Sequence, residues 1–69
     1  MNSEVLTGKV KFYVIQSGYG FIVNDKDGTD MFFHHTGLEE GTKVMKDDKV
    51  QYEVEEGKKG KKAIKIVKL

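Results

Sequence analysis

Cysteine and arginine are absent from this chain of 69 residues, and long apolar runs are absent as well. Without cysteine, disulfides, thiolate chemistry and cysteine-based zinc sites are excluded. Without arginine, every strong positive charge belongs to a lysine, which attracts phosphate as a point charge but cannot read a base with a bidentate guanidinium. No apolar stretch approaches the roughly 20 residues of a membrane span. The first residues also lack the basic region and apolar run of a signal peptide. We therefore expect a cytoplasmic protein without a membrane partner.

A helical pattern is lacking too, because no window of ten or more residues has a convincing apolar period of 3.6 residues. A chain of this length has room for one small core and lies near the lower limit of independent stability. We expect a single domain over residues 1–69, with an ordered barrel over about residues 6–68.

Strand patterns are present along most of the chain. Five segments are rich in β-branched and aromatic residues or alternate apolar with polar residues, namely residues 8–14, 18–24, 31–34, 49–55 and 61–68. The Asp-Gly pair in residues 25–29 predicts a hairpin turn, and residues 35–46 are irregular. Closure into a barrel removes the exposed edges of a small sheet. We therefore predict an all-β fold, a small five-stranded antiparallel barrel.

The alternation also predicts which side chains fill the barrel. The expected core consists of Val10, Ile22, Met31, Phe33, Leu38, Val50, Val54, Ile64 and Ile66.

The two segments with most rings, residues 18–23 and 31–35, carry the main functional signal. If Ile22 and Phe33 point inward, alternation leaves an aromatic set on the outer surface: Tyr19, Phe21, Phe32 and His34. Exposed flat rings are costly unless something stacks on them, and every nucleobase offers a π-face. The glycines beside Tyr19 are interpreted as room for a flat ligand. In the alternative, Tyr19 and Phe21 lie in the core and Ile22 lies outside.

The charge is unevenly distributed, although the net charge is only +1. Residues 58–69 contain six lysines and no acid, whereas residues 39–56 contain seven acids and three lysines. The lysine-rich end is either a solvated tail or a surface that attracts phosphate.

Catalytic and metal-binding patterns are not found. His34 and His35 are neighbours on a predicted strand, so they should point to opposite faces, and no third histidine completes a metal site. Asp47 and Asp48 lie between lysines in a polar turn, which favours a solvated turn over paired catalytic carboxylates. We expect no enzyme activity, no cofactor and no small-molecule substrate.

Two motifs resemble those of the bacterial cold-shock proteins. Residues 17–22, Ser-Gly-Tyr-Gly-Phe-Ile, resemble that family's Lys-Gly-Phe-Gly-Phe-Ile, and residues 30–35, Asp-Met-Phe-Phe-His-His, resemble its Asp-Val-Phe-Val-His-Phe. The opening residues 8–13 and the glycine-containing loop at residues 56–60 are also similar, so the likeness covers nearly the whole chain. The resemblance implies an OB-type barrel that binds single-stranded RNA and single-stranded DNA with low sequence specificity. It further implies a monomer that acts as an RNA chaperone or as a cold-shock regulator of transcription and translation.

The resemblance assigns roles to individual positions. The stacking residues would be Phe12, Tyr19, Phe21, Phe32, His34 and His35, and the polar residues beside them Lys11, Asp30 and Lys59. Strict alternation would put Phe12 on the same face as Val10, so the family arrangement requires a bulge in the first strand.

The chain departs from the family pattern near these motifs. It has Phe12 in place of tryptophan, His35 in place of phenylalanine, Val14 in place of asparagine, Ser17 in place of lysine and Lys61 in place of proline. It also lacks an aromatic residue between residues 36 and 49.

Two other binding modules share part of the pattern. An RNA-recognition motif would also use the run at residues 18–21, but it requires two helices. A small barrel could instead bind a proline-rich peptide on an aromatic groove.

Overall fold

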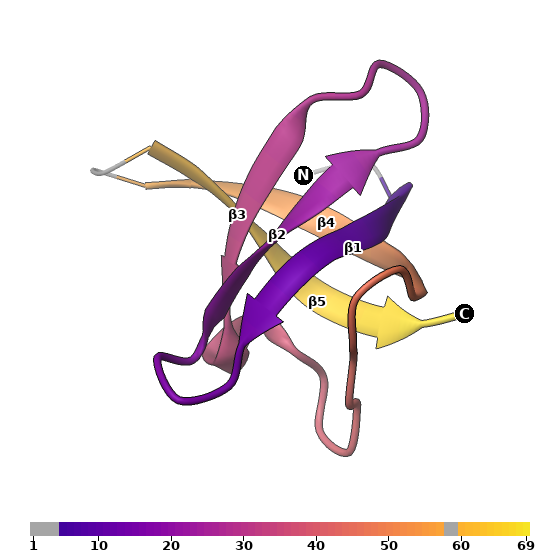
Figure 1. Cartoon of the computed structure of the whole chain (residues 1–69). Helices are drawn as coiled ribbons and strands as arrows, with labels where there is room; N and C mark the ends of the chain where they lie inside the picture. Colours follow the sequence, from indigo (N-terminus) through magenta and orange to yellow (C-terminus); the bar gives the residue numbers. More distant parts are fainter. Residues whose placement is uncertain (1–4, 58–59) are drawn as a thin grey trace.

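The computed structural model describes residues 5–57 and 60–69. In this part of the chain, five strands form a closed barrel in the order β1-β2-β3-β5-β4 (Figure 1). The strands are β1 (Leu6–Val14), β2 (Tyr19–Asn24), β3 (Asp30–His34), β4 (Lys49–Gly57) and β5 (Gly60–Lys68), and a 3-10 turn, η1 (His35–Gly37), follows β3. This confirms the all-β, five-stranded barrel.

One pairing in the barrel is parallel. β3 meets β5 in parallel at Phe33 and Ala63, whereas the other strand pairs are antiparallel. A parallel contact arises because the long connection after η1 carries the chain around the barrel before β4 and β5 begin (Figure 1). No helix in residues 5–57 and 60–69 is long and apolar enough to cross a membrane.

Two bulges set the direction of the side chains. In β1, Val10 pairs with Ile22 but Phe12 pairs with Phe21, so Lys11 is an extra residue on this strand. In β5, the register with β4 shifts between the Gln51 and Glu53 pairings, close to Lys65, whose φ is 51°. A bulge exchanges the faces of the residues that follow it.

The core confirms most of the predicted interior and corrects part of it. The buried apolar residues are Val10, Ile22, Phe33, Val44, Val50, Tyr52, Ala63 and Ile66, with Leu6, Tyr13, Met31, Leu38 and Val54 packed against them. The prediction for Ile64 was wrong, because the bulge near Lys65 turns Ala63 rather than Ile64 into the core. The prediction also missed Val44 and Tyr52, both of which are buried.

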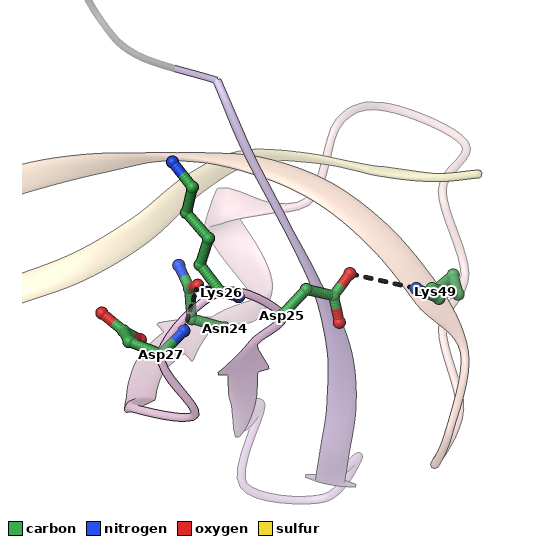
Figure 2. Close-up of polar contacts among 5 residues, drawn as sticks. All are labelled: Asn24, Asp25, Lys26, Asp27 and Lys49. Atoms are coloured by element: carbon green, nitrogen blue, oxygen red, sulfur yellow. Dashed lines mark hydrogen bonds and ion pairs between the residues drawn. The ribbon is translucent and has the colours of Figure 1, made fainter.

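Asn24 connects the turn between β2 and β3 to the interior. Its Nδ2 donates to the hydroxyl of buried Tyr52 over 3.0 Å. Its Oδ1 accepts from the backbone N–H of Lys26 over 2.7 Å, as Figure 2 shows. Burial raises the pKa of the Tyr52 phenol above its ordinary value of 10.0. Beside this turn, Lys49 Nζ donates to Asp25 over 3.0 Å, which ties the turn to the first residue of β4 (Figure 2).

Candidate nucleic-acid interface

Four rings lie together on the outer face of β1, β2 and β3, and we call them the ring surface: Phe12, Tyr19, Phe21 and Phe32. Ring centroids of Phe12 and Phe21 are 5.4 Å apart, and those of Phe21 and Phe32 are 5.9 Å apart. The Tyr19 ring stacks near Phe32 at 6.1 Å. Phe32 is 37% exposed and the other three rings are half-buried against one another.

The strand register explains this cluster. Phe21 is paired with Phe12 on one side and with Phe32 on the other, so the three rings form a row across the sheet. Phe12 joins the row only because Lys11 is the extra residue of the β1 bulge. The bulge that the family resemblance required is therefore present. Ile22, which alternates with these rings, is fully buried, so the alternative with Tyr19 and Phe21 in the core is excluded.

Val14 belongs to this face as well, and sequence reasoning missed it. It pairs with Tyr19 and is 36% exposed. After the bulge, Phe12 and Val14 share one face of β1 because they are two residues apart. The missing signal was the bulge itself, since it decides which face the end of β1 presents.

His34 and His35 lie side by side, which corrects the expectation that they point to opposite faces. Their ring centroids are 4.3 Å apart. Strand alternation ends at this point because η1 begins at His35. The Nδ1 atom of His34 lies 3.0 Å from Oγ1 of Thr36 and accepts from the Thr36 N–H over 3.4 Å. Since His34 pairs with Tyr19, the two imidazoles lie beside the ring surface where β3 passes into η1.

The glycines around Tyr19 allow close packing of their neighbours rather than leave open room for a ligand, which corrects their interpretation from sequence. A Cβ on Gly20 would lie 2.3 Å from the carbonyl oxygen of Phe12 and 2.8 Å from the ring of Phe33. Gly18 has a φ of +74°, and a Cβ there would lie 2.5 Å from the ring of His35. Both glycines are buried, so each is required by close packing of its neighbours.

The polar residues expected beside the rings are partly in place. Lys11 Nζ donates to Asp30 over 3.0 Å at the edge of the ring surface, and both side chains are about half exposed. Lys59 lies outside the described residues. Among residues 5–57 and 60–69, no group of three His, Asp or Glu side chains could hold a metal ion.

The fold and the surface together define a small OB-type β-barrel with a cluster of rings on the outer face of three adjacent strands. The chain matches the model of the 'Cold-shock' DNA-binding domain over residues 6–69. It belongs to the cold-shock domain family, whose members are nucleic-acid-binding proteins rather than enzymes.

Curated relatives and a solved structure agree with this assignment. The chain is 44% identical to a cold shock-like protein of Thermotoga maritima over an aligned length of 66, and the alignment covers 90% of this chain and 98% of that protein. It is 39% identical to the cold shock-like protein CspG of Shewanella violacea over an aligned length of 69, and the alignment covers 97% of this chain and 99% of the relative. The structure titled drosophila Unr CSD456 superposes with a TM-score of 0.81 at 22% identity, over 99% of this chain and 28% of the other. That structure supports the fold.

Proposed function

We propose that this protein binds single-stranded RNA and single-stranded DNA by stacking bases on the ring surface. The observation that carries the proposal is the row formed by Phe12, Phe21 and Phe32 on the outer face, with centroids 5.4 and 5.9 Å apart, in which Phe32 is exposed and the other two rings are half-buried. Successive bases of a single strand stack on such rings. His34 and His35 supply two further flat groups at the end of the row.

Low sequence specificity follows from the chemistry of this surface. Every base has a π-face, so stacking tolerates any sequence. The chain has no arginine for bidentate contact with guanine. Lysines supply sequence-independent attraction to phosphate, and the family resemblance adds Lys59 to Lys11 in this role. A duplex is disfavoured because its bases are already stacked on one another.

A module with these properties fits a cytoplasmic monomer that keeps RNA unpaired, either as an RNA chaperone or as a cold-shock regulator of transcription and translation. Both roles require rapid, sequence-tolerant contact with exposed bases. The binding mode is the same in each, so the test below addresses the binding mode itself.

The test is a titration of a labelled single-stranded oligonucleotide with the parent and with two variants, Phe32→Ala and Val67→Ala. Phe32 and Val67 are each 37% exposed, but Val67 lies on β5, away from the ring surface. Phe32→Ala should lose about 1–3 kcal/mol of binding, the usual value of one base stack. Val67→Ala should bind as the parent does.

A proline-rich peptide and a hairpin duplex serve as competitors in the same titration. We expect neither to displace the single strand. Displacement by the peptide, or equal binding by Phe32→Ala and Val67→Ala, would overturn the proposal. Changing Lys59 to Gln should make the slope of log affinity against log salt concentration shallower by less than about one unit. The change should be similar for all oligonucleotide sequences.

A further inference from the structure

An open hollow of about 450 Å³ lies where the ring surface ends on β1. Three lysines line it: Lys9 and Lys11 from β1, and Lys46 from the connection that precedes β4. Lys11 directly precedes Phe12 in the chain and also reaches Asp30 at the edge of the rings. The hollow therefore continues the ring surface beyond Phe12, on the side away from His34.

The fold holds Lys46 at this place by hydrogen bonds on both sides of it. The Asp47 N–H donates to the Val10 carbonyl over 2.7 Å, and the Val10 N–H donates to the Asp48 carbonyl over 2.9 Å. The Met45 N–H donates to the carboxylate of Asp48 over 2.9 Å. The connection thus returns alongside β1 next to the bulge (Figure 1), and Lys46 is fixed close to strand residues that are far away in sequence.

The charges around the hollow favour an anion. Its acidic lining residues are Asp25 and Asp47. The carboxylate of Asp25 accepts a hydrogen bond from Lys49 over 3.0 Å, so its charge is compensated from outside the hollow. Lys11 shares its charge with Asp30. Lys9 and Lys46 also line the hollow, with Asp47 as the remaining acid.

We propose that this hollow is a phosphate-binding subsite. It would hold the backbone of a single strand where the strand continues beyond the base stacked on Phe12. The inference rests on the proposed single-strand binding. It adds Lys46, from the connection that precedes β4, to the residues that would contact the single strand. Lysines contact phosphate as point charges, and each phosphate neutralised on a single strand adds about −0.7 to the slope of log affinity against log salt.

The test compares Lys46→Gln with Lys43→Gln, in which the same charge is removed from the same connection but outside the hollow. Affinities are measured for oligothymidylates of increasing length at several salt concentrations. For long oligonucleotides, Lys46→Gln should bind roughly threefold more weakly than Lys43→Gln and show a slope shallower by about 0.7. For the shortest oligonucleotides, which end on the rings, the two variants should bind alike. Lys9→Gln should reproduce the length dependence of Lys46→Gln.

The outcomes separate the two proposals. If the parent binds no single strand, the proposed function fails and the subsite fails with it. If the parent binds but Lys46→Gln and Lys43→Gln behave alike at every length, only the subsite is overturned. A thermal melt of each variant checks that the lost affinity does not arise from unfolding. All three lysines are exposed, so the three substitutions should leave the melting temperature unchanged.

Discussion

The outer surface over β1, β2 and β3 and the outer surface over β4 and β5 belong to one barrel but have different chemistry. The first carries the rings, with centroids 5.4–6.4 Å apart. The second carries cross-strand ion pairs, Lys62 with Glu55 at 3.6 Å and Lys65 with Glu53 at 4.0 Å. The two surfaces therefore differ in what solvent meets, rings on one and paired charges on the other, and the proposed function assigns binding to the surface with the rings.

The aromatic residues divide in the same way. Tyr13, Phe33 and Tyr52 lie inside or against the core, with the rings of Tyr13 and Phe33 5.4 Å apart. The other four form the ring surface. Phe32 and Phe33 are neighbours in the chain, yet one is 37% exposed and the other is fully buried. This adjacent pair offers a direct test of the comparison.

Phe33→Ala and Phe32→Ala should have opposite effects. Truncation of a fully buried phenylalanine costs about 3–5 kcal/mol, which is close to the whole stability of a domain of this size. Phe33→Ala should therefore be largely unfolded at room temperature. Phe32→Ala should remain folded while it loses single-strand affinity. Circular dichroism melts together with an oligonucleotide titration measure both effects, and a folded Phe33→Ala or an unfolded Phe32→Ala would contradict the assignment of faces.

Gly20→Ala should destabilise the barrel because its Cβ would meet the carbonyl oxygen of Phe12 and the ring of Phe33. Overpacking of this kind costs about 1–3 kcal/mol. Gly57→Ala is the control, since among the described residues its Cβ would meet only the carbonyl oxygen of Gly60, at 3.8 Å. Denaturant unfolding should show a lower midpoint for Gly20→Ala alone. If Gly20→Ala keeps full stability but weakens binding, the glycine makes room for a ligand after all.

Sequence reasoning predicted the five strands and the faces of β2 and β3, because simple alternation holds along both. It failed where pairing between strands overrides alternation. The bulge near Lys65 places Ala63 rather than Ile64 in the core. Where β3 ends, the chain turns and His34 lies beside His35. These features depend on register with another strand or on a following turn, and neither is encoded in the local apolar pattern.

The bulge at Lys11 is a different case. Alternation alone placed Phe12 inside with Val10, whereas the family resemblance required it outside, and the structure agrees with the resemblance. A family pattern carries information about the bulge that a single strand segment lacks. Val14 was missed for the same reason, since the shift at Lys11 also decides its face. Lys46 could not be found either, because hydrogen bonds between its connection and β1 bring it to the hollow.

The buried Tyr52 phenol makes stability depend on alkaline pH. Its pKa in the folded protein is raised above 10.0 by burial, so the unfolded chain releases this proton first. Its contribution is fully present below pH 10.0 and is lost as pH rises through the raised pKa of the folded state. The unfolding free energy of the parent relative to Tyr52→Phe should therefore decrease above pH 10.0. If the difference in unfolding free energy between the parent and Tyr52→Phe stays constant with pH, the pKa of Tyr52 is not raised by folding.

Phe12→Trp should strengthen the ring surface. An indole offers more stacking area than a phenyl ring, so single-strand binding should tighten by roughly 0.5–1 kcal/mol. The new side chain would be the only tryptophan in the protein, and base stacking should quench its fluorescence. A large drop in melting temperature would mean that residue 12 packs inside. If the variant is stable and its fluorescence is not quenched by the oligonucleotide, β1 takes no part in binding.

Glu53→Gln tests the charged surface and should have the smallest effect. It removes the ion pair with Lys65, in which the Lys65 side chain is 61% exposed and the Glu53 side chain is 18% exposed. A pair that stays open to solvent at the lysine contributes about 0.2–1 kcal/mol. The loss of stability should shrink further as salt is added, because salt screens exposed charges. Single-strand affinity should stay that of the parent at moderate salt, since Glu53 lies on β4, away from the rings. If Glu53→Gln instead changes affinity as strongly as Phe32→Ala does, the nucleic acid also contacts the charged surface, and the division of the barrel into a binding face and a structural face is wrong.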